Sequence, residues 1–156
     1  MGITGTFEGY ISSVLYLFNN GVWFNLQTTG WNGAGTDISN GRKITVKTNI
    51  ISSAYTAYAL CSLLQTFNLS NYKYIKITTI RNTSYEYCDG LIGISSRYNG
   101  TINDFISSST NASSGTTILD ISSINGSYYI YIGMKYSARS NKTYEMTVTQ
   151  LYLTNS

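Results

Sequence analysis

Residues 14–26 read VLYLFNNGVWFNL, which is two apolar and aromatic runs, Val14–Phe18 and Val22–Leu26, around Asn19-Asn20-Gly21. An Asn-Gly pair between such runs is the strongest short-range signal of a β-hairpin, because both residues accept the positive φ angles of a tight turn. The stretch therefore predicts two antiparallel strands near the start. The rest of the chain agrees in composition: Thr, Ile and Tyr, which favour strands, are abundant.

Three later stretches, 42–50, 72–80 and 128–134, alternate between apolar and polar residues, which is the pattern of a half-buried strand. We expect Ile75 and Ile77 to face inward. In the third stretch we expect Ile130, Ile132 and Met134 to face one way, and Tyr129 and Tyr131 the other. We expect a long loop over 27–41, rich in Gly, Asn and Thr, and a turn at Asp89-Gly90. Further strands are predicted at Tyr55–Leu64 (favoured there over a short helix), Leu91–Ser96, Thr116–Ser122 and Tyr144–Leu153, with a short one at Phe105 and Ile106 in the otherwise polar stretch 97–115.

Eight or nine strands with turn signals at regular intervals suit a sandwich or a barrel. We expect an all-β fold, an antiparallel β-sandwich that is jelly-roll-like. The alternation fits sheets that each have one buried and one solvent-facing side. We expect residues 1–12 to form an N-terminal arm or first strand and residues 13–156 to form a single domain, since no internal repeat or linker interrupts the sequence.

The charge content and the apolar runs of the sequence limit the classes of partner that we expect. Charged residues make up 11% of the chain, against about 25% in a typical domain, so Ser, Thr, Asn and Tyr must fill the solvent-facing positions. The net charge is +3, and Lys and Arg never cluster into the stripe that phosphate binding needs, so we expect no nucleic-acid partner. No apolar run reaches the roughly 18 residues of a membrane helix, and we expect no membrane partner.

The start of the chain lacks the basic residues and apolar run of a signal peptide. A protein acting outside the cell would then leave by another route, such as lysis of a phage-infected host, unless the chain is a piece cut from a larger protein. The two cysteines, Cys61 and Cys88, leave a disulfide and a pair of buried thiols both open.

Side chains suited to catalysis are few. The sequence has no histidine, which removes Ser-His and Cys-His nucleophile pairs and histidine-ligated metal sites. Seven acids are present, and a glycosidase-like carboxylate pair formed in space stays open, although no two acids share a motif. Asp37, Asp89 and Asp104 fall in predicted loops, but without the spaced acidic motif of a calcium site. We expect no enzymatic activity, no cofactor and no metal.

Aromatic residues in or beside predicted loops are the stronger signal. Exposed Tyr and Trp offer large, rigid contact area at low entropy cost, and their ring faces suit the apolar face of a sugar while polar side chains bond its hydroxyls. The alternative is that many of the 15 tyrosines are cross-strand partners on solvent-facing sheet surfaces. The predicted ligand-binding residues are Trp31, Arg81, Tyr85, Tyr87, Asp89, Arg97 and Tyr98.

Three stretches carry a resemblance: LYLFNNG (15–21) followed by Gly30-Trp31, LSNYKYIKI (69–77) and TILDISSINGSYYI (117–130). Together they resemble accessory β-domains in virion and tail-appendage proteins of phages that infect Gram-positive or gut bacteria. The resemblance implies a jelly-roll domain, similar to a carbohydrate-binding module, that is structural or binds carbohydrate. It implies no catalytic residues, because the matching positions are core and turn positions.

Two functions follow as expectations. The first is a non-catalytic phage virion module that binds host-surface glycans as part of a tail or capsid appendage. The second is a purely structural virion protein, used in capsid decoration or tail assembly, whose tyrosines contact neighbouring subunits. A small carbohydrate-active enzyme is a third, less favoured. We expect a virion location, outside the cell after host lysis, and other virion proteins, host glycans and copies of the same chain as partners.

Overall fold

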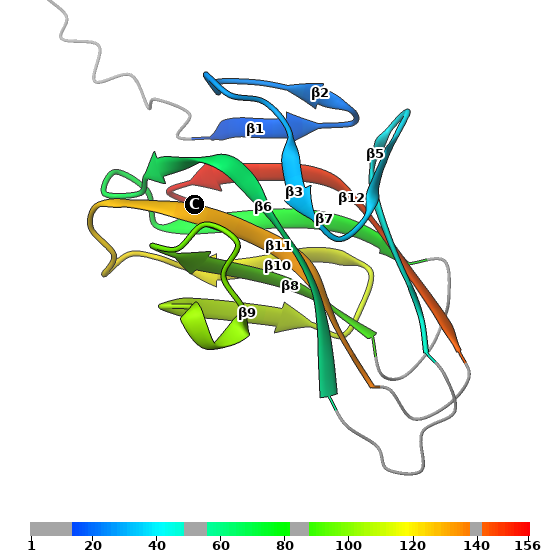
Figure 1. The fold of residues 1–156 in the computed structure, drawn as a ribbon. Helices are drawn as coiled ribbons and strands as arrows, with labels where there is room; N and C mark the ends of the chain where they lie inside the picture. The colour runs from blue at the N-terminus through cyan, green and yellow to red at the C-terminus, as the bar shows by residue number, and fades with distance from the viewer. Residues whose placement is uncertain (1–13, 49–55, 82–87, 138–141) are drawn as a thin grey trace, which may run out of the picture.

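The computed structural model describes residues 14–48, 56–81, 88–137 and 142–156. They form two antiparallel sheets stacked face to face, which confirms the predicted all-β sandwich (Figure 1). Sheet A contains β1 (Leu15–Asn19), β2 (Val22–Trp23), β4 (Thr36–Ile38), β5 (Gly41–Lys47), β7 (Tyr74–Arg81), β10 (Gly115–Asp120) and β12 (Thr143–Thr154). Sheet B contains β3 (Trp31–Gly33), β6 (Thr56–Asn68), β8 (Cys88–Ser95), β9 (Ser107–Asn111) and β11 (Ser127–Ser137). A short 3₁₀ helix, η1 (Ile102–Asp104), lies between β8 and β9.

The eight strands from β5 to β12 pair in a nested order. β5 pairs with β12, β6 with β11, β7 with β10 and β8 with β9, all antiparallel. The strand orders are therefore β5-β12-β7-β10 in sheet A and β6-β11-β8-β9 in sheet B. β12 is long enough to pair twice on one side, with β5 along its first half and with β1 along its second. The jelly-roll character of the sandwich stays a prediction.

The N-terminal hairpin forms as the Asn-Gly signal predicted. β1 and β2 pair through Phe18–Trp23 and Asn19–Val22. Asn20 and Gly21 have φ angles of 46° and 86°, the positive values that this tight turn demands. β2 is only two residues long, so the hairpin is stabilised mainly by the pairing of β1 with β12.

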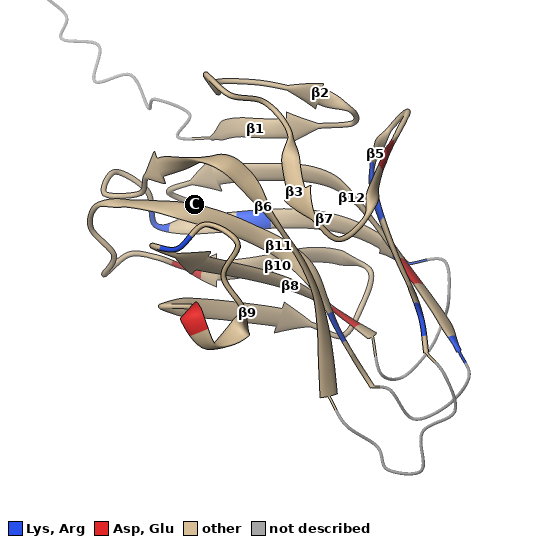
Figure 2. Ribbon diagram, viewed as in Figure 1, with Lys and Arg blue, Asp and Glu red and all other residues tan. Residues whose placement is uncertain are grey.

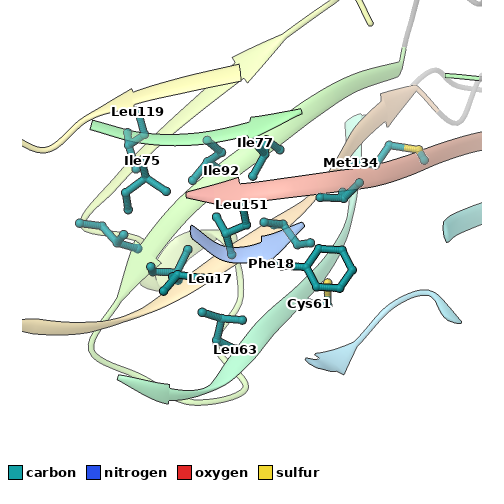
Figure 3. Close-up of a cluster of buried hydrophobic side chains, with 14 of the residues drawn as sticks. Leu17, Phe18, Cys61, Leu63, Ile75, Ile77, Ile92, Leu119, Met134 and Leu151 are labelled. Atoms are coloured by element: carbon teal, nitrogen blue, oxygen red, sulfur yellow. The ribbon is translucent and has the colours of Figure 1, made fainter. Parts of the chain in front are cut away.

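The core lies between the sheets and is filled by residues spaced two apart along each strand (Figure 3). Ile75 and Ile77 of β7 contribute from sheet A, and Ile130, Ile132 and Met134 of β11 contribute from sheet B; all five are fully buried. Removing each such side chain from water stabilises the fold by roughly 1.5–3 kcal/mol. The inward positions of 72–80 and 128–134 are thus those that the alternation predicted.

The prediction of one long loop over 27–41 was wrong, because this stretch contains β3 and β4. They are Trp-Asn-Gly and Thr-Asp-Ile, only three residues each, so neither carries a periodic apolar signal. Arg42, which is buried, holds the stretch in place by donating hydrogen bonds of 2.8–3.2 Å to the carbonyls of residues 33–35. It also pairs with the Asp37 carboxylate at 3.1 Å.

The predicted turn at Asp89-Gly90 was also wrong, since both residues lie inside β8. Gly90 faces the core, where an added Cβ would lie 3.2 Å from Thr117 Oγ1 and 3.5 Å from the Met146 sulfur. This glycine therefore makes room between the sheets rather than a turn. The short strand predicted at Phe105 and Ile106 begins at the next residue instead, as β9.

The cysteines are two buried thiols. Cys61 in β6 pairs with Ile132, and Cys88 in β8 pairs with Tyr136, on the two sides of β11. Strands two positions apart are about 9.5 Å from each other, beyond the reach of a disulfide. Burial raises the pKa of Cys61 to about 12 and that of Cys88 to about 11, so both remain protonated at neutral pH.

Candidate functional site

The connection between β8 and β9, residues 96–106, folds back over the outer face of sheet B. Tyr131 of β11 anchors it: its hydroxyl donates a 2.5 Å hydrogen bond to the Arg97 carbonyl and accepts one of 2.8 Å from the Gly100 amide. The Phe105 ring packs on the Tyr131 ring, with centroids 5.0 Å apart, and lies against Gly93, where any Cβ would meet it. The loop is therefore attached to the sheet through an aromatic pair as well as polar bonds.

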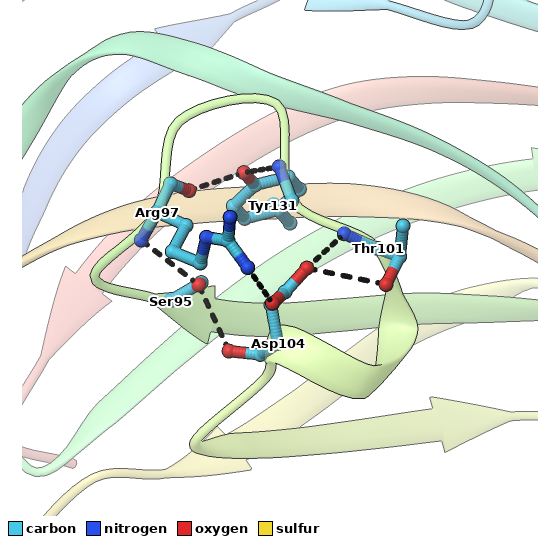
Figure 4. A network of polar contacts seen from close by, with 6 residues as sticks. Ser95, Arg97, Thr101, Asp104 and Tyr131 are labelled. Carbon is cyan, nitrogen blue, oxygen red and sulfur yellow. Dashed lines mark hydrogen bonds and ion pairs between the residues drawn. The ribbon is translucent and has the colours of Figure 1, made fainter.

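Asp104 fixes the conformation within this loop (Figure 4). One carboxylate oxygen accepts hydrogen bonds from the Thr101 amide at 2.7 Å and the Thr101 hydroxyl at 3.2 Å, and the other pairs with the Arg97 guanidinium at 2.8 Å. The Thr101 amide and the Arg97 guanidinium hold the pKa of Asp104 below its usual value. The Ser95 hydroxyl adds a bond to the Asp104 carbonyl at 2.9 Å and accepts one from the Arg97 amide at 3.0 Å.

The loop presents a polar and aromatic surface. Tyr98 is 44% exposed, and its ring packs at a tilt of 46° against the Tyr129 ring of β11, with ring centroids 5.4 Å apart. Asn99 has a φ angle of 56°, and its side-chain oxygen accepts a hydrogen bond from the side-chain amide of Asn32 in β3. The Arg97 side chain is 71% exposed even though it pairs with Asp104. We call this set, Asn32, Arg97, Tyr98, Asn99 and Tyr129, the Tyr98 surface.

The Tyr98 surface combines two kinds of contact. A ring face can pack against the apolar face of a sugar, while amide and guanidinium groups bond its hydroxyls. Because the loop is already ordered by Asp104 and Tyr131, little conformational freedom remains to be lost when a ligand binds. The arrangement is a rigid surface that carries both aromatic and hydrogen-bonding groups.

Trp31, one of the predicted ligand-binding residues, is not part of this surface. It lies in β3 rather than in a loop, and its ring packs toward the core against Phe18 and Trp23, at centroid distances of 5.1 and 4.7 Å. The Arg42 guanidinium lies 5.9 Å from its ring centroid. Trp31 therefore contributes packing around the N-terminal hairpin.

Arg81 and Asp89 lie toward the opposite end of β8. The Arg81 guanidinium donates to the carbonyls of Cys88 and Ala112, which links β7 to β8 and to the β9–β10 connection. Asp89 lies opposite Lys135 in the backbone register of β8 and β11. Asp89 and Ser95, six positions apart in one strand, are roughly 20 Å from each other. The structure thus brings Arg97 and Tyr98 together and separates them from Arg81 and Asp89, while Tyr85 and Tyr87 lie outside the described residues.

Sequence reasoning missed the residues that organise the loop. Thr101-x-x-Asp104 matches the Thr-x-x-acid signature of a helix start, so the η1 turn and its Asp104 contacts had a local signal. Tyr129 and Tyr131 were predicted to face away from the core, but their pairing with a loop 30 positions earlier had none. Asn32 was assigned to a loop and joins the site only through β3.

No three His, Cys, Asp or Glu residues within ranges 14–48, 56–81, 88–137 and 142–156 gather closely enough to hold a metal ion. Over the same ranges no helix has the length and apolarity needed to cross a bilayer. Neither a protein-family model nor a curated protein matches this chain. Function must therefore be argued from the Tyr98 surface and the fold that carries it.

Proposed function

We propose that this chain is a non-catalytic phage virion module that binds host-surface glycans through the Tyr98 surface. The observation that carries the proposal is the exposed ring of Tyr98, which packs on Tyr129 and belongs to a loop held rigid by Asp104 and Tyr131. Exposed aromatic rings on rigid supports beside hydrogen-bonding groups are what sugar recognition requires. A virion location rests on the resemblance to phage appendage domains.

The strand pairing supports the jelly-roll part of the proposal. Nested pairs, first strand with last and inward to β8 with β9, describe one long antiparallel ribbon rolled into two sheets of four strands. Eight strands in two sheets is the jelly-roll arrangement found in viral capsid and lectin domains. The short strands β1 to β4 then extend its edges.

The acids support a binding role over catalysis. A glycosidase general acid needs a raised pKa to stay protonated, whereas hydrogen bonds lower the pKa values of both Asp104 and Asp120. Asp37 and Glu145 are committed to ion pairs with Arg42 and Lys43. These four carboxylates serve the local structure.

Binding of wild-type chain to host cell-wall polysaccharides on a glycan array tests the proposal. We expect Tyr98→Ala to bind about tenfold more weakly, because an aromatic contact contributes about 1 kcal/mol beyond the area it buries. Arg97→Ala should also weaken binding. Tyr58→Ala is the matched control, since Tyr58 is a partly exposed tyrosine of sheet B outside the Tyr98 surface.

Equal binding by wild type and Tyr98→Ala would contradict the proposal, provided that the variant has an unchanged melting temperature. A wild-type chain that binds no glycan, or that cleaves the polysaccharide, would also contradict it. Absence of glycan binding by the wild-type chain would favour the alternative, a purely structural virion protein.

A further inference from the structure

The outer face of sheet A is unlike the Tyr98 surface, because strands alone form it among the residues that the structure describes. In one row across four strands, Tyr16 of β1, Tyr152 of β12, Lys76 of β7 and Ile118 of β10 lie in register. The next row holds Asn19, Gln150, Thr78 and Thr116, in which Gln150 donates to Asn19 at 3.1 Å and accepts from Thr78 at 3.0 Å. We call these eight residues, together with Tyr74, Ile80 and Asp120, the Tyr152 face.

Exposed apolar side chains gather on this side of the molecule. Of the nine large hydrophobic side chains that are exposed in the described part of the chain, six belong to strands of sheet A or adjoin them: Val14, Val22, Phe24, Ile38, Ile80 and Ile118. Ile80 is 53% exposed and Ile118 46%. These two isoleucines lie on the Tyr152 face, and with its tyrosines and few charges the face has the composition that protein interfaces favour.

Charge on the face is sparse and of both signs (Figure 2). Lys43 and Glu145, on β5 and β12, already form an ion pair at 2.8 Å. Lys76 lies 5.6 Å from the Tyr74 ring centroid and donates to the Ser156 carbonyl, while the Asp120 carboxylate accepts bonds from Ser122. Lys76 and Asp120 therefore offer one positive and one negative group on neighbouring strands. Within the residues that the structure describes, these two side chains form no ion pair with each other.

This charge pattern suits contact with a second copy of the chain. In a two-fold contact the same patch meets itself in reverse, so a group on one copy faces a different group on the other. A patch with Lys76 on β7 and Asp120 one row away on β10 can place each charge against its opposite across the axis. Tyrosines and isoleucines then fill the rest of the contact without repulsion.

We propose that the Tyr152 face binds the same face of a second copy of this chain, giving a two-fold dimer. The Tyr98 surface lies on the outer face of the other sheet and stays free in such a dimer. The dimer would carry two glycan sites, but its formation does not depend on glycan binding. Failure of either proposal therefore leaves the other standing.

Sedimentation velocity on the full chain over a concentration series tests the dimer. Wild type should self-associate, and Ile118→Lys and Ile80→Lys should each raise the dimer Kd at least tenfold. Ile106→Lys is the matched control, because Ile106 is 51% exposed but adjoins β9 of sheet B, and it should dimerise like wild type. Melting temperatures identify any variant that fails to fold, and either of the two sheet A variants suffices for the test.

A charge exchange tests the two-fold geometry. Lys76→Glu and Asp120→Lys should each weaken the dimer, since each puts like charges across the axis, and the double variant should recover most of the association. A wild-type chain that is monomeric at every concentration overturns the proposal. So does a dimer that is weakened by Ile106→Lys and not by Ile118→Lys, or a double variant weaker than both single variants.

Discussion

The two outer faces of the sandwich are both poor in charge, but they are built in different ways. On sheet B, a loop of eleven residues from 96 to 106 covers the strands, and its polar groups are bonded to one another and to Tyr131. On sheet A the strands themselves form the surface, and Tyr152 and Ile118 project from them in register. A folded-back loop creates a small, rigid and irregular surface, whereas bare strands create a broad and regular one.

Tyr131 and Tyr152 illustrate the contrast between the two outer faces. Tyr131 and Tyr152 both occupy outward positions on central strands. Tyr131 is nearly inaccessible, and its hydroxyl makes two hydrogen bonds to the loop. Tyr152 stays partly exposed beside Tyr16, with ring centroids 5.3 Å apart, and partial burial and the neighbouring Tyr16 raise its pKa. A covered tyrosine holds structure in place, while an uncovered one is available to a partner.

The largest expected effect comes from Gly93→Ala. The new Cβ would lie 2.1–2.9 Å from three ring carbons of Phe105, so the ring must leave its place on Tyr131. We expect the free energy of unfolding to fall by about 1–3 kcal/mol, as for other overpacked sites, and glycan binding to fall with it. Urea denaturation measures the first and the glycan array the second. Dimerisation through sheet A should persist, and its loss would mean that the two faces are not independent.

Tyr131→Phe should have a smaller effect on stability. The variant keeps the ring but removes both hydrogen bonds to the loop, which should cost about 1 kcal/mol and speed hydrogen exchange at the Gly100 amide. Tyr152→Phe is the control on sheet A, because the Tyr152 hydroxyl makes no hydrogen bond in the part of the chain that the structure describes. Equal destabilisation by the two variants would remove the contrast between the faces.

Acid should loosen the loop on sheet B. Because the pKa of Asp104 is lowered in the folded chain, its contacts stabilise the loop above the ordinary aspartate pKa of about 4, and that contribution is lost as pH falls through the lowered value. Glycan binding should therefore decline at the acid end of a titration. Asp104→Asn should bind more weakly at neutral pH and show a flatter pH profile; an unchanged profile would mean that Asp104 does not order the site.

The smallest expected effect belongs to the ion pair on sheet A. Lys43 and Glu145 project from paired strands that are held by backbone hydrogen bonds, and both side chains are partly exposed. Glu145→Gln should therefore change the free energy of unfolding by no more than about 0.5 kcal/mol. Urea denaturation measures this change. A loss of unfolding free energy as large as that of Tyr131→Phe would show that the ion pair stabilises sheet A more than a partly exposed pair should.

Much of the fold was readable from local pattern. Alternation located the inward residues Ile75, Ile77, Ile130 and Ile132, and Asn20-Gly21 located the first turn. Local pattern failed where tertiary contacts decide. Gly90 looks like a turn residue and is instead a core-facing position in β8, where an added Cβ would lie only 3.2 Å from Thr117 Oγ1.

The site was harder to predict than the fold. Tyr98 and Arg97 were identified because they are an aromatic residue and a cation in a polar stretch, and the structure places them in one loop. Trp31 has the same local signature but packs against Phe18 in a strand. Solvent-facing and core-facing aromatics look alike in sequence until the covering segments are known, and contacts such as that between Asn32 and Asn99 join residues 67 positions apart.

The nested strand pairing also sets an order for folding. Ile94 and Ser107, in the innermost pair of strands, lie 13 positions apart, whereas Arg42 and Val148, in the outermost pair, lie 106 apart. Forming the inner pair first shortens the chain that must close for the next one. We therefore expect the β8–β9 hairpin to act as an early nucleus, folding to take roughly milliseconds to seconds, and a chain still being synthesised to stay without its outer pairs until β12 has emerged.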